Sequence, residues 1–100
     1  MEIRVQSLHF DADKKLVDFI EKKLSKLETF YDGIISAEVI LKLEPSGQIQ
    51  DKLAEIRLSV PGTILISKDK EKSFEAAIDA NSESLRRQLI KYKEKRIQYN

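Results

Sequence analysis

The cations near the C-terminus are the residues in this sequence whose type and spacing most suggest chemistry. The run from 84 to 100, SLRRQLIKYKEKRIQYN, contains one acid, Glu94, and six cations: Arg86, Arg87, Lys91, Lys93, Lys95 and Arg96. Lysine and arginine gathered on one regular element are typical of a surface that binds a polyanion, most often RNA or DNA. A solvated helix end whose dipole attracts positive charge would also explain them.

The overall charge is nearly balanced, so these cations are segregated along the chain. Eighteen Lys and Arg oppose 17 Asp and Glu, for a net charge of +1. One hundred residues with 41% hydrophobic content suit one domain with one core. The chain has no cysteine, no apolar run of membrane-spanning length and no signal-peptide pattern. We therefore expect a single cytoplasmic domain covering residues 1–100.

Catalytic chemistry finds little support in the sequence. The single histidine, His9, follows an expected strand and has no serine, cysteine or carboxylate pattern around it that would make it a base. A metal site needs several ligands at defined spacing, and the glycine-rich loops that hold nucleotide phosphates are absent. The sequence thus predicts a protein that is not an enzyme and that has no cofactor, metal or small-molecule substrate.

Hydrophobic periodicity predicts the element order β-α-β-β-β-α. Strands are expected over 1–8, 36–45, 53–60 and 63–67, with a loop at 45–48 extended by the polar residues 49–52, and a charged loop at 68–72. Asp13 and Ser73 are expected to cap the two helices. The first helix would bury Leu16, Phe19, Ile20, Leu24 and Leu27, and the second Phe74, Ala77, Ile78, Leu85, Leu89 and Tyr92.

This order predicts the α+β class. One apolar stripe on each helix and a polar outward face on the third strand favour a two-layer sandwich, with two helices on one face of a four-stranded sheet. The arrangement resembles that of double-stranded-RNA-binding domains. At 100° per residue, Lys15, Lys22 and Lys26 fall in one stripe of the first helix, with Lys23 nearer the core. The second helix presents Arg87, Lys91 and Lys95 on one flank and Arg86 and Lys93 on the other. If the helices pack side by side, the stripes are expected to form one basic surface.

Two stretches resemble a known family: KLSKLETFYDGIISAEVILKLEP (23–45) and FEAAIDANSESLRRQLIKYKEK (74–95). The family is that of the ribosome hibernation-promoting factors, also called the ribosome-associated inhibitor or sigma-54 modulation family. The resemblance extends over nearly the whole chain and includes VPG at 60–62. Ser73 and Ser84 depart from the family pattern, which often has Asp and Lys there. The chain is most similar to the short type of the family.

The resemblance implies a function and a partner. Such proteins bind the small ribosomal subunit in the channel that mRNA and tRNA occupy, and they silence translation in stationary phase or stress. Contact with the rRNA backbone is carried over to the cations that match the family pattern: Lys23, Lys26, Arg87, Lys91 and Lys93. The helical stripes add Lys22, Arg86 and Lys95 to these candidate RNA-binding residues. Away from the ribosome a monomer without membrane contact is expected.

Two other functions remain open at this point. The first is that of a general RNA-binding module that acts away from the ribosome. A protein-interaction regulator, such as a sigma-factor modulator, would place an acidic protein against the same cations. A double-stranded RNA shift assay tests the first of these functions, and RNase treatment before a pull-down tests the second.

Overall fold

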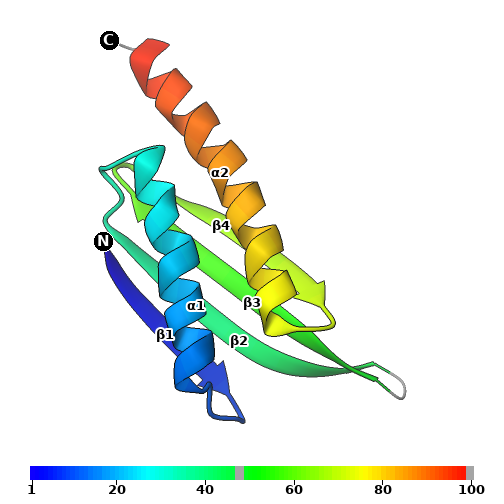
Figure 1. Ribbon diagram of the computed structural model, residues 1–100. Coiled ribbons are helices and arrows are strands. Elements are labelled where there is room, and N and C mark those ends of the chain that lie inside the picture. Colours follow the sequence, from blue (N-terminus) through cyan, green and yellow to red (C-terminus); the bar gives the residue numbers. More distant parts are fainter. Residues whose placement is uncertain (47–48, 99–100) are drawn as a thin grey trace.

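A four-stranded sheet carries two α-helices on one of its faces (Figure 1). The computed structural model describes residues 1–46 and 49–98. Along the chain the elements are β1 (Glu2–Leu8), α1 (Lys14–Ser25), the short 3₁₀ helix η1 (Lys26–Thr29), β2 (Ser36–Ser46), β3 (Ile49–Val60), β4 (Thr63–Glu71) and α2 (Phe74–Gln98). The predicted α+β two-layer architecture and its element order are confirmed.

The strands lie in the order β1-β2-β3-β4. The first pair is parallel and is joined through α1, with Val5 opposite Val39. The other two pairs are antiparallel hairpins. Only two residues, Pro61 and Gly62, connect β3 to β4, and Gly62 has a φ of 87°, where a side chain would be strained.

Both helices begin at the predicted caps. The Asp13 carboxylate accepts a hydrogen bond from the Leu16 amide at 2.8 Å, and the Ser73 hydroxyl accepts one from the Ala76 amide at 3.1 Å. These side chains satisfy amides that have no partner within the first turn of a helix. The α-helical part of the first helix is shorter than predicted, because residues from Lys26 onward adopt the tighter 3₁₀ form.

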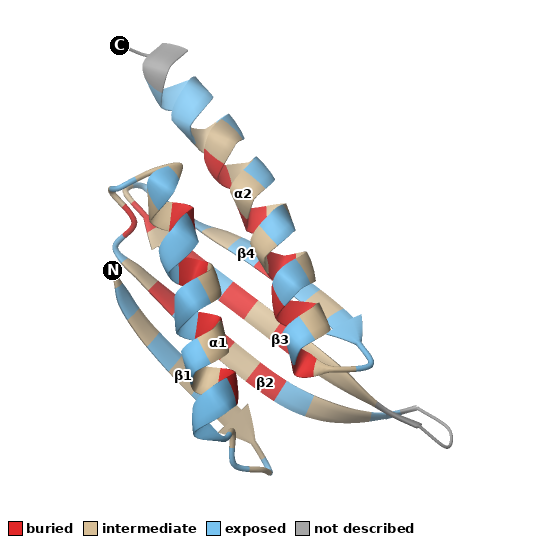
Figure 2. Cartoon of the chain, viewed as in Figure 1, coloured by how far each residue is buried: buried red, intermediate tan, exposed pale blue. Residues whose placement is uncertain are grey.

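The core lies between the helices and the two central strands. Alternate residues of β2 and β3 point toward the helices and are fully buried: Val39, Leu41, Ala54, Ile56 and Leu58. The helices bury Ile20, Leu24, Ile78, Leu85 and Leu89 against them. The surfaces of the helices that face away from the sheet are exposed (Figure 2). Burial of one helical stripe and one sheet face is the two-layer solution that the hydrophobic pattern predicts.

Two segments predicted as loops are strands. Residues 49–52 begin β3, where Asp51 lies opposite Glu44, and residues 68–71 complete β4, where Glu71 lies opposite Lys52. Ion pairs support both extensions, since Lys70 contacts Glu44 at 3.5 Å and Lys72 contacts Asp51 at 3.1 Å. The loop prediction was wrong because charged side chains can occupy a strand that is paired with its neighbour. The ends of β2 and β3 project past the helices (Figure 1), whereas β4 stays beside α2, where Asp69 accepts a hydrogen bond of 2.8 Å from Asn81. Residues 47–48 of the predicted loop lie outside the described residues.

Two isoleucines on adjacent strands provide a matched test of this core. Ile56→Ala should lower the free energy of unfolding by about 2–5 kcal/mol, since Ile56 is fully buried. Ile64→Ala should cost less than about 1 kcal/mol, because the Ile64 side chain is 55% exposed. Urea unfolding followed by circular dichroism measures both. Equal losses would contradict the assignment of the two sheet faces.

Candidate nucleic-acid interface

The two helices run in the same direction and lie side by side, and the C-terminal end of the first helix lies beside the middle of α2, which extends further (Figure 1). Contacts between them confirm the alignment. Lys23 Nζ of α1 lies 2.8 Å from a carboxylate oxygen of Asp79 in α2. Two turns further along, the Arg86 guanidinium lies over the Phe30 ring, 5.9 Å from its centroid. The alignment brings Lys23 and Lys26 next to Arg86.

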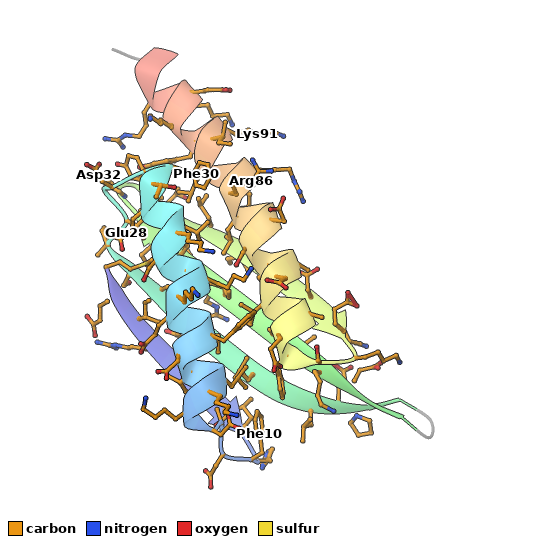
Figure 3. The ribbon with its side chains drawn as sticks, viewed as in Figure 1. Phe10, Glu28, Phe30, Asp32, Arg86 and Lys91 are labelled. Carbon is orange, nitrogen blue, oxygen red and sulfur yellow. The ribbon has the colours of Figure 1, made fainter. Side chains whose placement is uncertain are left out.

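A groove separates the C-terminal end of the first helix from α2. It has a volume of about 430 Å³ and is lined by three of the predicted cations, Lys23, Lys26 and Arg86, together with the ring of Phe30. Phe30 lies where η1 ends, next to α2, and Arg86 projects from α2 (Figure 3). Glu83 is the acidic residue of the lining. We call this groove, lined by Lys23, Lys26, Phe30, Glu83 and Arg86, the helix groove.

Acids on α2 neutralise part of the helix groove. Asp79 holds Lys23, and Glu83 lies 3.1 Å from Arg86 and 4.0 Å from Arg87. These pairs are partly or largely exposed, so each contributes little to folding stability. Any phosphate that enters the groove has to compete with the two carboxylates for the cations.

The flanks of α2 are oriented differently from the sequence-based expectation. Lys91 and Lys95 line a second groove of about 330 Å³ with Thr63 and Leu65 of β4, on the side of α2 away from α1. The α2 cations that line hollows shared with the first helix are instead Arg86 and Lys93. The prediction that the Arg87, Lys91 and Lys95 stripe would join that of α1 was therefore wrong.

The remaining predicted cations lie around these grooves. Lys22 is exposed on α1, and Arg87 is exposed on the outer surface of α2, with 63% of its side chain accessible. Lys93 lines a hollow of about 330 Å³ that also contains Glu28 and Asp32, so its surroundings are mixed in charge. All eight candidate residues lie in the helix layer, distributed over more than one face of α2.

The C-terminal part of α2 is held to the rest of the fold by Tyr92. Its hydroxyl donates a hydrogen bond of 2.5 Å to the Pro61 carbonyl and accepts one of 3.0 Å from Arg96. The Tyr31 ring packs edge-on against Tyr92 with the ring centroids 5.4 Å apart. Burial first, and then the neighbouring Tyr92 phenol, raise the pKa of the Tyr31 phenol above its usual value of 10.0. The helix thus remains anchored where it extends beyond the sheet.

Sequence reasoning missed three members of the site. Phe30, Asp79 and Glu83 were not among the predicted site residues. Their place at the site depends on contacts between residues distant in the chain, such as those of Phe30 with Arg86 and of Lys23 with Asp79. The presence of an aromatic residue directly after a lysine-rich helix was the available signal for Phe30.

A match to a family model shows the family to which the chain belongs. The model described as sigma 54 modulation protein / S30EA ribosomal protein matches residues 3–97. The chain belongs to this family. Three similar relatives are each named ribosome hibernation promoting factor. The protein of Azotobacter vinelandii is 35% identical over 98% of this chain and 88% of its own length. Those of Pseudomonas putida and Klebsiella oxytoca are 34% and 32% identical, covering 95% and 99% of this chain and 89% and 100% of their own lengths.

Solved structures show the same fold. The N-terminal domain of Protein Y from Thermus thermophilus matches with a TM-score of 0.81 and 27% identity, covering 92% of this chain and 99% of that domain. A ribosomal subunit interface protein from Coxiella burnetii matches with a TM-score of 0.82 and 22% identity, over 94% of this chain and 99% of that one. No helix in the described ranges 1–46 and 49–98 is long and apolar enough to cross a membrane.

The raised pKa of Tyr31 predicts a pH dependence of this anchor. A phenol whose pKa is higher in the folded than in the unfolded chain stabilises the fold below about pH 10 and loses that contribution as the pH rises through the folded value. The stability advantage of the wild type over Tyr31→Phe should therefore shrink above pH 10. Urea unfolding at a series of pH values measures the difference, and a constant gap would contradict the assignment.

Proposed function

We propose that the protein is a ribosome hibernation factor that binds the small ribosomal subunit in the mRNA and tRNA channel. It thereby inhibits translation in stationary phase or stress, and it is a monomer away from the ribosome. The observation that supports this most is the parallel packing of the helices, which places Lys23 and Lys26 beside Arg86 around one groove. The names of the relatives support the same role.

Phosphate contact is the chemistry that this surface supplies. Lysine and arginine displace the counterions condensed on RNA when they neutralise its backbone phosphates. This release contributes affinity that does not depend on the RNA sequence. The helix layer provides exposed cations on both helices, namely Lys22, Lys26, Arg87 and Lys91. A domain held by such contacts in the channel would block mRNA and tRNA by its volume, because it occupies the space they need. No reaction at a catalytic centre is required.

Reversal of the groove charges tests the proposal directly. Lys26→Glu with Arg86→Glu should lower affinity for small subunits at least about a hundredfold, since each charge-assisted contact contributes roughly 1.5–3 kcal/mol and 1.4 kcal/mol is a tenfold change. The matched control is Lys42→Glu with Lys68→Glu, two exposed lysines on the sheet face away from the helices. The control makes the same change in net charge. Co-sedimentation with purified subunits at several salt concentrations measures both variants.

A second double variant distinguishes the contributions of the two flanks of α2 to binding. Lys91→Glu with Lys95→Glu changes the groove beside β4 and leaves the helix groove intact. A loss of binding comparable to that of the helix-groove variant would show that both faces contact rRNA. Normal binding by the helix-groove variant, with its circular dichroism spectrum unchanged, would contradict the proposed surface.

Substitution of Glu83 should strengthen binding, whereas the charge reversals above should weaken it. Glu83→Gln removes the carboxylate that lies near both Arg86 and Arg87. If these arginines bind phosphates, the substitution should strengthen binding to small subunits several-fold, because the arginines no longer have to leave an ion pair. Glu75→Gln, at the first turn of the same helix, is the matched control. Equal affinities of the two variants would place Arg86 and Arg87 outside the contact.

A second candidate function is favoured by the family description, which includes sigma 54 modulation. In that function the cations of the helix layer would contact an acidic surface of a transcription protein. Pull-down of partners before and after RNase treatment distinguishes the two. Ribosomal proteins lost on RNase treatment indicate rRNA binding, whereas a partner retained after treatment indicates protein contact.

A further inference from the structure

One aromatic side chain lies among the cations instead of in the core. Of the four phenylalanines in the sequence, Phe74 is buried in the core, and Phe10 and Phe19 pack against it. Phe30 is half-buried and belongs to neither group. Its ring lines both the helix groove and the adjoining hollow that contains Lys93. Hydrophobic packing in the core therefore does not account for this residue.

Cations line both hollows beside the Phe30 ring. Lys23, Lys26 and Arg86 line the groove with it, and Lys93 lines the adjoining hollow together with Glu28 and Asp32. The Arg86 guanidinium lies 5.9 Å from the ring centroid, near the outer limit of a cation–π contact. The guanidinium is also held by Glu83. Arg86 therefore covers the ring loosely, and the groove of about 430 Å³ beside it has the size of a small-ligand site.

An aromatic face next to Lys and Arg is the combination by which proteins bind unpaired nucleotides. The bases stack on the ring or on the guanidinium plane, and the cations contact the flanking phosphates. Phosphate contacts alone would not require an aromatic ring at the centre of the groove. The groove therefore offers base stacking in addition to the backbone contact that the sequence predicts.

We propose that Phe30 is a stacking platform for one unpaired RNA base, with Lys26 and Arg86 contacting the phosphates on either side. This inference rests on the proposed function and specifies the form of RNA that the groove accepts. The groove takes a single-stranded or extruded nucleotide, not a continuous duplex. To free the ring face, Arg86 moves from its position over the ring to the flanking phosphate.

Fluorescence of a stacked base tests the proposal. The probe is a short single-stranded RNA with one 2-aminopurine among uridines, whose emission falls when the base stacks. The protein variants are Phe30→Leu, which keeps apolar volume without a ring, and Phe30→Tyr, which keeps the ring. We expect quenching with the wild type and Phe30→Tyr, and none with Phe30→Leu. Phe30→Leu should bind the probe roughly five- to a hundredfold more weakly, the loss that removal of one base–aromatic stack gives.

Salt dependence separates stacking from phosphate contact. Phe30→Leu should keep the wild-type slope of affinity against salt, whereas Lys26→Ala should reduce that slope by about one and retain the quenching. An RNA of the same length with abasic positions throughout should bind wild type and Phe30→Leu equally, because it has no base to stack. Since Phe30 lies outside the core, all variants should unfold at nearly the wild-type urea concentration.

Two failures would have different meanings. If the wild type co-sediments with small subunits and binds the probe, but Phe30→Leu matches it in affinity and quenching, the stacking platform is overturned and the proposed function stands. If the wild type neither co-sediments with small subunits nor binds the probe, the proposed function is overturned, and the stacking platform with it.

Discussion

The parallel packing of α1 and α2 against β2 and β3 is the constraint on which the remaining features depend. Fully buried residues on both helices, such as Leu24 and Leu85, share one core with Leu41 and Ile56 of the sheet. Because this contact is apolar and close-packed, neither helix can rotate or slide without exposing core surface to water. The direction of each helix is therefore set, and the C-terminal end of the first helix lies beside the middle of α2. The basic groove lies there as a consequence of the core.

The groove holds like charges close together, and the fold limits the cost of doing so. The C-terminal end of α1 carries a partial negative charge that favours Lys22 and Lys23 in its last turn. Asp79 and Glu83 add full negative charges beside Lys23 and Arg86. These acids stabilise the free protein only slightly, since the pairs are exposed. Their larger effect is on binding, because a polyanion must break these ion pairs before its phosphates can pair with the cations. The affinity of the surface is then tuned by acids as well as by cations.

Much of the architecture is predictable from periodicity, and the errors have a common physical origin. The caps Asp13 and Ser73 and the alternating core of β2 and β3 follow from local patterns. The ends of β3 and β4 do not, because residues 68–71 are all charged and residues 49–52 contain a single apolar residue. No apolar alternation is present to detect, and Asp69, on the side of β4 that faces α2, accepts a hydrogen bond from Asn81. Only the register with the neighbouring strand shows that these polar segments are strands.

The sequence by itself determined which residues share a helical flank, since Arg87, Lys91 and Lys95 follow from the 3.6-residue period. It also determined the class of the fold and the concentration of cations toward the C-terminus. The tertiary structure alone decided which flank of α2 faces α1, and it selected Arg86 and Lys93 over Lys91 and Lys95. It also placed Phe30 beside Arg86. The physical reason is that the period of a helix determines angles around its own axis, whereas the rotation of that axis relative to a neighbour is determined by packing between distant residues.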